Sequence, residues 1–209
     1  MVWREWNSRW TSPWISRLSS FDRHKHDLGS AFAGYVDRWR DQLWNEPLRV
    51  ATQMYVEANG PITADTSLLL GQALLELIGW VRFVEELQTR TAADFKDVRA
   101  SERLRELLVW IDVDPAIPTS LAALDQEAMR RKPPWADGPH AITEMRNSLV
   151  HPPRRKRLTA TPVHARIDLQ ELALWYAELA LLRLIDYRGE YANRLGAKAT
   201  GMVENVPWM

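Results

Sequence analysis

The sequence has no cysteine among its 209 residues, and it has no net charge, because 27 basic side chains balance 27 acidic ones. The absence of cysteine excludes disulfides, thiolate nucleophiles and cysteine-ligated zinc or iron–sulfur sites, and it is compatible with a reducing cytosol. The charge balance shows that the molecule as a whole is not a polycation. Any site for an anionic partner must therefore be local.

Long uncharged apolar runs are also missing. The two most apolar stretches, residues 68–84 and 172–185, carry the charged residues Glu76, Arg82, Glu178 and Arg183. These charges favour buried helices of a soluble protein over membrane spans. The first five residues, Met-Val-Trp-Arg-Glu, lack the apolar core of a signal peptide. We therefore expect a cytoplasmic protein without membrane association.

Apolar positions recur at helical spacing along most of the chain, and neither a strand pattern nor an internal repeat is present. The expected helices cover residues 28–44, 48–58, about 63–89, 101–111, 119–131, 140–151 and 168–195. The helix over 63–89 is apolar around most of its circumference, so we expect it at the centre, with Gly71 and Gly79 where a neighbour approaches closely. Asp168 and Glu171 resemble a capping box that opens the last helix. The predicted fold class is all-α, a helical bundle.

Three parts are expected along the chain. Asn59-Gly60-Pro61 is the best internal boundary, and it separates a tryptophan-rich helical extension (1–60) from a helical domain (61–195) and a C-terminal tail without periodicity (196–209).

Eleven tryptophans are present, and four of them, Trp3, Trp6, Trp10 and Trp14, are spaced to share one helical face. This face packs on its own domain, docks a partner protein or sensing domain through Trp3, Trp6 and Trp10, or lies on a membrane surface.

Basic residues concentrate in one window. Residues 130–157 contain eight Lys or Arg against two acids, which gives this window a charge of about +6 and leaves about −6 on the rest. The basic residues are Arg130, Arg131, Lys132, Arg146, Arg154, Arg155, Lys156 and Arg157. This asymmetry predicts an anionic partner.

The centre of this window is the segment Arg146-Asn147-Ser148-Leu149-Val150-His151, closed by Pro152-Pro153. On a helix over 140–151, Asn147 and His151 are neighbours one turn apart. Arg146 lies roughly 140° from His151 around the axis, so one chain supplies only half of a site containing both. Two copies of the helix would complete it, which predicts a symmetric homodimer.

These residue types suit RNA cleavage without a metal. A histidine takes the proton from a ribose 2′-OH or donates one to the 5′-oxygen. An arginine binds the scissile phosphate and stabilises its developing charge. Asn147 would position the phosphate or the histidine, and Arg154, Arg155, Lys156 and Arg157 would bind the RNA backbone. The alternatives stay open: His151 as a helix C-terminal residue, the cation run as solvated charge, and Glu76 as an edge carboxylate rather than a partner for arginine or histidine.

The segment from Arg146 to Pro152 resembles the arginine–asparagine form of the motif of HEPN ribonuclease domains. The segments Ala73–Leu77 with Trp80, Arg103–Leu108, Trp135–Gly138 and Glu171-Leu172 extend this resemblance to the ApeA-like branch, over about residues 61–195. The resemblance implies a HEPN-like bundle and a homodimer that cleaves RNA without metal or cofactor and leaves a 2′,3′-cyclic phosphate. It implies that Arg146 and His151 are catalytic and Asn147 supporting, with Glu76 as a weaker candidate. It also implies a role in bacterial anti-phage defence, abortive infection or as a toxin.

Members of this branch have a large N-terminal sensing region, whereas about 60 residues precede the domain here. The chain is thus expected to be a short stand-alone form or a piece of a longer protein. Three hypotheses follow for its function: an endoribonuclease, a non-catalytic RNA-binding or interaction module, and a structural protein that docks through its tryptophans.

Overall fold

The computed structural model describes residues 21–151, 160–196 and 203–209, and it is an all-α fold, as predicted. In chain order the elements are α1 (Phe21–Arg40), α2 (Asn45–Ala58), α3 (Ala64–Trp80), the π-helix η1 (Val81–Glu86), α4 (Ala92–Asp97), α5 (Ala100–Trp110), α6 (Ala122–Arg130), α7 (Gly138–Val150), α9 (Val163–Leu184), β1 (Glu190–Tyr191) and β2 (Glu204–Asn205). The predicted tryptophan stripe at residues 3–14 and the cation run at 154–157 lie outside the described residues. The expected boundary near residue 60 falls in the connection between α2 and α3.

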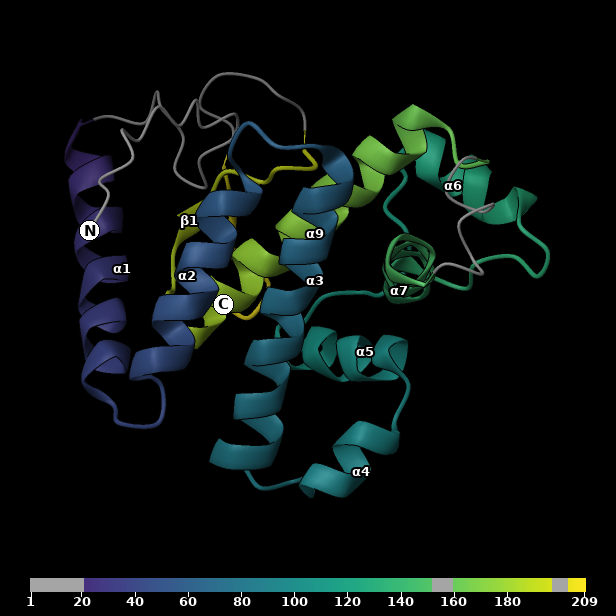
Figure 1. Cartoon of the computed structure of the whole chain (residues 1–209). Helices are drawn as coiled ribbons and strands as arrows, with labels where there is room; N and C mark the ends of the chain where they lie inside the picture. Colours follow the sequence, from purple (N-terminus) through teal and green to yellow (C-terminus); the bar gives the residue numbers. More distant parts are fainter. Residues whose placement is uncertain (1–20, 152–159, 197–202) are drawn as a thin grey trace.

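Helix α3 lies at the centre of the bundle and packs against α2, α5, α7 and α9 (Figure 1). Its buried residues, including Leu68, Leu74, Leu75 and Ile78, lie within an arc of roughly 160° around the helix axis, and Ala73 on the other side is exposed. Gly71 packs against Ala173 of α9, where an added Cβ would lie 3.4 Å from the alanine methyl carbon. The prediction that Gly71 marks a close helix approach is therefore confirmed.

The segment Ala64–Glu86, which joins α3 and η1, is long and apolar enough to cross a membrane by length and composition. In the fold, 56% of its apolar window is buried. Such burial is typical of a core helix in a globular protein, and a core helix can be as long and as apolar as a membrane span.

The helix predicted over 63–89 is not regular to its end. After Trp80 it widens into the π-helix η1, and Gln88, with a φ of 53°, ends it. Within this segment, Nη1 of Arg82 lies 2.6 Å from Oε2 of Glu86. Such π segments are typically single turns inserted in a helix, and periodicity alone does not predict them.

Helix α1 docks on the end of α9 at one close contact. A Cβ at Gly34 would lie 2.0 Å from the carbonyl oxygen of Ile185, so only glycine allows the two backbones to approach this closely. One turn later, Arg38 donates to the carbonyl oxygen of Leu184 at 2.9 Å and to Glu86 at 2.9 Å. Arg38 thus ties α1 to both α9 and η1.

The last helix and the tail differ from the prediction. Helix α9 begins at Val163 rather than Asp168 and ends at Leu184, about ten residues before the predicted end. The tail was expected to lack regular structure, but β2 pairs with β1, and Nε1 of Trp208 donates to the carbonyl oxygen of Tyr187 at 2.9 Å. The described part of the tail therefore packs on the core.

The close contact at Gly34 predicts opposite effects for two alanine substitutions in α1. Gly34→Ala should lower the free energy of unfolding by about 1–3 kcal/mol, because the added methyl group meets a backbone oxygen that has no room to move. Gly29 has nothing within 4 Å of its added Cβ, so Gly29→Ala should raise helix stability by about 0.5–1 kcal/mol. Urea unfolding, with hydrogen exchange of the α1 amides, measures both. Equal effects would contradict this docking geometry.

The contacts of Glu86 predict that the stability of the junction between α1 and η1 depends on pH. Burial alone would raise the pKa of Glu86, but hydrogen bonds from Arg82 and Arg38 outweigh it, and the pKa is lower than the ordinary glutamate value. Because the folded-state pKa is lowered, the stabilisation is present above the unfolded-state pKa and is lost as the pH falls through the folded-state pKa. At neutral pH, Glu86→Gln should cost about 1 kcal/mol after allowance for solvent screening. The difference between the two proteins in urea unfolding should shrink in acid; a constant difference would contradict the prediction.

Candidate functional site: helix α7 and its basic face

Helix α7 is anchored at its N-terminal end by an aspartate cap. The side chain of Asp137 accepts a hydrogen bond from the backbone N–H of His140 at 2.8 Å. Arg105 of α5 clamps the same carboxylate with two bonds, from Nε at 2.6 Å and from Nη2 at 3.0 Å. This paired geometry fixes where α7 begins, and therefore where its later turns lie.

The predicted core face of α7 is confirmed. Ile142 and Met145 are buried, and Leu149 packs against the same core. The helix ends at Val150, and His151 follows it in extended backbone with φ −109° and ψ 112°. This ending is expected before a proline, which disfavours helical conformation in the residue that precedes it.

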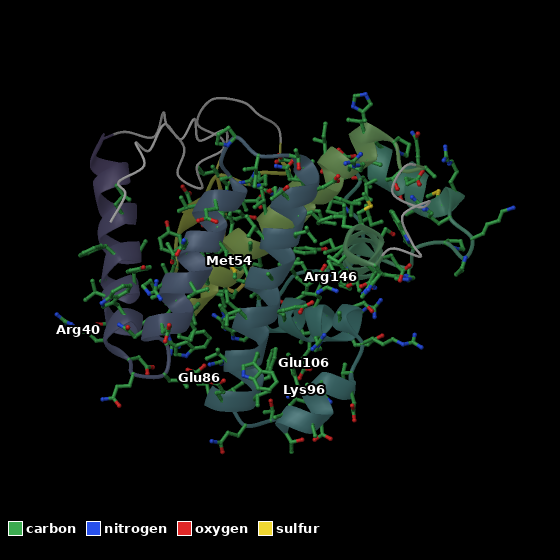
Figure 2. The ribbon with its side chains drawn as sticks, in the orientation of Figure 1. Arg40, Met54, Glu86, Lys96, Glu106 and Arg146 are labelled. Carbon is green, nitrogen blue, oxygen red and sulfur yellow. The ribbon has the colours of Figure 1, made fainter. Side chains whose placement is uncertain are left out.

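The candidate catalytic residues lie at this end of α7 but do not form one site within the chain. His151 is exposed, and its backbone N–H donates to the carbonyl oxygen of Asn147 at 3.1 Å. Arg146 is half-buried on the side of α7 toward α3 and α5 (Figure 2). Its Nη1 makes a long contact of 3.5 Å with Oδ1 of Asn147. Asn147 is thus next to both residues, as its place between them in the sequence requires.

Glu76 is not brought to these residues. Its carboxylate accepts a hydrogen bond from Gln72, one turn earlier on α3, at 2.8 Å. Among the described residues it forms no ion pair with Arg146 or His151. The described residues also contain no group of three His, Asp or Glu side chains placed to hold a metal ion.

The opposite side of α7 lines a pocket of about 250 Å³. Its lining residues come from the turn after α6 and from one face of α7: Arg130, Arg131, Lys132, Pro133, Trp135, His140, Glu144, Met145 and Ser148. His140, Glu144 and Ser148 are spaced by four residues, so they follow one another along this face. Arg146 is roughly 120–160° away from them around the helix axis. The pocket and Arg146 are therefore on opposite sides of α7.

The pocket keeps an excess of positive charge. Arg130 and Arg131 share one buried carboxylate, Glu127, at 3.3 Å and 2.7 Å. Lys132 is exposed beside them, and Glu144 is the acid on the facing helix. Around this pocket, three cations thus face two carboxylates in the described part of the chain. The side chain of Arg130 is 68% exposed, so its guanidinium remains accessible to a ligand.

Two ring systems complete the pocket. The guanidinium of Arg131 lies 4.7 Å from the ring centroid of Trp135, within cation–π range. Nδ1 of His140 accepts a hydrogen bond from the backbone N–H of Ala136 at 3.0 Å, which leaves Nε2 of the neutral ring as a donor. The site therefore offers a planar surface and several hydrogen-bond donors.

In the sequence analysis the three cations at 130–132 entered only as part of a charge count, and nothing in the sequence indicated that Trp135 and His140 join them. Their meeting depends on the turn between α6 and α7, in which the backbone N–H of Trp135 donates to the carbonyl oxygen of Ala128 at 3.1 Å. A cluster of cations next to an aromatic residue is the signal that would have found this pocket.

Comparison with known proteins changes the family assignment. The model of the YopA C-terminal domain family matches residues 41–205. A relative from Bacillus subtilis (strain 168), the "SPbeta prophage-derived uncharacterized protein YopA", is 26% identical over 211 residues, which cover 100% of this chain and 46% of the relative. The chain thus spans about half the length of the curated relative it matches. No solved structure matches it.

The expected membership of the HEPN superfamily is wrong, because the family that matches most of the chain is a different one. The resemblance was built on a short motif whose spacing one helix end can provide in many unrelated bundles. Arg146, Asn147 and His151 lose the support of that resemblance and depend on their own chemistry. The match from residue 41 to residue 205 spans α2 through β2, and the chain belongs to the YopA C-terminal domain family.

Proposed function

We propose that this chain binds single-stranded RNA through the basic pocket between α6 and α7. The proposal rests on one observation: the exposed cations Arg130 and Lys132 line the same pocket as the Trp135 ring. Cations bind the phosphate backbone, and aromatic side chains stack on unpaired bases. Cytoplasmic location belongs to the same proposal.

The shape of the pocket favours a nucleotide over an acidic peptide. A volume of about 250 Å³ is close to the lower end of small-molecule sites and is lined partly by the flat Trp135 ring. A peptide carboxylate would use the cations but would leave the donor of His140 without a partner. Single-stranded RNA supplies phosphate, an aromatic base and base-edge acceptors together.

Charge removal at the pocket tests this binding. The double variant Arg130→Gln/Lys132→Gln should bind a fluorescein-labelled 20-nucleotide RNA about tenfold more weakly at moderate salt. Its slope of log K against log salt should fall by about 1.4, which is about 0.7 for each cation removed from a single-strand site. Fluorescence anisotropy at several salt concentrations measures both quantities. An acidic peptide that competes better than RNA would reject the proposal.

Arg188→Gln is the matched control. Its side chain is 66% exposed and pairs with Asp186 at 3.4 Å, much as the side chain of Arg130 is 68% exposed and pairs with Glu127 at 3.3 Å. It lies beyond the far end of α9, roughly 33 Å of helix away from the end that packs on α6. RNA affinity should be unchanged in this variant. An equal loss in both proteins would mean that binding is not local to the pocket.

Metal-independent RNA cleavage is a second candidate function. It is supported by the exposed imidazole of His151, which follows the last turn of α7 and has no side-chain partner among the described residues. In this proposal, His151 takes the proton of a ribose 2′-OH, the 2′-oxygen attacks phosphorus, and the bond from phosphorus to the 5′-oxygen breaks. The leaving 5′-oxygen takes a proton from water, and the product is a 2′,3′-cyclic phosphate. Arg146 of a second copy would stabilise the pentavalent phosphorus. A defence or toxin role depends on this activity.

Cleavage should persist in EDTA and fall by about 10²–10⁴ in His151→Ala, the usual contribution of a general acid or base. His164→Ala, an exposed histidine on α9, is the control and should cleave normally. Mixed dimers test the composite site: Arg146→Ala and His151→Ala, each inactive alone, should regain activity when combined, since one of the two sites then has both residues. Absence of cyclic-phosphate product in the unmodified protein would reject this candidate and leave the binding proposal intact.

A further inference from the structure

A second pocket, unrelated to the basic one, lies between α1, α2 and α9. Its volume is about 300 Å³. The walls are mostly apolar and include Leu28 and Phe32 of α1, Val56 of α2 and Leu181 of α9. Phe32 is 68% exposed and Leu28 51% exposed, which is unusual for large apolar side chains that surround a hollow. Figure 1 shows α1 at the opposite side of the molecule from α6 and α7.

One wall of this pocket carries a buried charge. The side chain of Glu178 lines the pocket, yet only 2% of it is exposed. Its Oε1 accepts three hydrogen bonds, from Tyr55 Oη at 2.7 Å, from Arg194 Nε at 3.0 Å and from Arg194 Nη2. Its Oε2 has no hydrogen-bond partner in the described part of the chain. Both nitrogens of Arg194 that reach Glu178 therefore bind the same oxygen.

Glu178 and Arg194 shift each other's pKa. Burial raises the pKa of Glu178 above the ordinary glutamate value, and the charge and hydrogen bonds of Arg194 oppose that rise. Burial alone would lower the pKa of Arg194, but the adjacent Glu178 raises it, and the pKa lies above the ordinary arginine value. Arg194 also contacts a second carboxylate, Glu171, at 3.3 Å. One guanidinium thus lies between two carboxylates, and the cluster keeps a net negative charge with one unused acceptor atom.

A buried carboxylate oxygen without a donor is costly, since leaving such a group unsatisfied costs its desolvation energy. The apolar side chains of the walls offer no donor, and the hydroxyl groups of Tyr35 and Thr52 in the lining make no hydrogen bond to Oε2. Tyr55 and Arg194 are already committed to the other oxygen. We infer that this pocket binds a small apolar molecule that carries one hydroxyl or amine group, which donates a hydrogen bond to Oε2 of Glu178. This inference does not depend on the proposed RNA binding.

The volume sets the size of the ligand. A dry apolar cavity of about 150 Å³ accommodates benzene, so a pocket twice as large suits a molecule of two fused rings or a similar apolar body. The polar group must be single and must donate, because the rest of the lining offers little to a second one. An anionic ligand is disfavoured by the net negative cluster.

A pair of probes that differ only in the donor tests the inference on the full chain. Titration calorimetry should show saturable one-site binding of 2-naphthol, and 2-methoxynaphthalene, whose oxygen cannot donate, should bind about tenfold more weakly. Equal affinities would overturn the inference, because they would show that Oε2 takes no part. Absence of saturable binding overturns it as well, whether water satisfies Oε2 or another segment or a second copy covers the pocket.

Two variants locate the binding. Thr52 lines the pocket and is only partly buried, so Thr52→Phe should fill it and abolish 2-naphthol binding. The neighbouring Gln53 is exposed on the other side of α2, and Gln53→Phe should bind as the unmodified protein does. Binding that survives in Thr52→Phe overturns the inference.

The Glu178→Gln variant tests the hydrogen bond from the ligand to Oε2 of Glu178. The amide oxygen must accept from Tyr55 and Arg194, which puts the NH₂ group where Oε2 was, so the preference for 2-naphthol over 2-methoxynaphthalene should disappear. An unchanged preference overturns the inference. If this variant does not fold, the probe pair on the unmodified protein and the Thr52→Phe result still decide.

Discussion

The buried pair of Glu178 and Arg194 is the interaction on which the arrangement of this bundle depends. Both side chains are almost fully buried, with 2% and 1% exposed, and they join α9 to the segment that follows β1. Tyr55 donates to Glu178, and Asn59 accepts from Arg194 at 2.6 Å, so α2 is held by the same group. Removal of one member of such a pair leaves a buried charge and typically costs about 3–5 kcal/mol. This cluster therefore ties together three segments that are far apart in the sequence: α2, α9 and the segment after β1.

Helix α1 is attached by different means. It contacts the bundle through the close approach at Gly34 and through Arg38, and it brings no buried charge. The family match begins at residue 41, one residue after α1 ends. The family model thus covers the bundle from α2 to β2, and α1 packs at the edge of this bundle. The apolar pocket lies at this edge, and α1 supplies four of its twelve lining residues.

The sequence predicted the fold where apolar spacing and local signals agreed. Helices α2, α5 and α7 were found to within a few residues because their buried faces repeat at helical spacing. The end of α9 was missed because Tyr187, Tyr191 and Leu195 continue a four-residue spacing although they are buried in non-helical backbone. Asp186, with a φ of 51°, breaks the helix before them. Asp168 caps a helix, but the helix is α6, through the N–H of Leu124 at 3.0 Å.

Some features of the candidate site follow from the geometry of one helix, and others depend on how the chain folds. The divergence of Arg146 and His151 followed from helix geometry alone, whereas the basic pocket exists only because the chain turns back after α6. The pocket lining on α7 ends at Ser148, three residues before His151, and Arg146 lies on the other side of the helix. A strand held in the pocket and extended past the end of α7 would therefore reach the histidine of its own chain but not the arginine. In the proposed scheme, binding therefore needs one chain and cleavage needs two. The two activities are separable, and dilution that dissociates a dimer would remove cleavage before it removes binding.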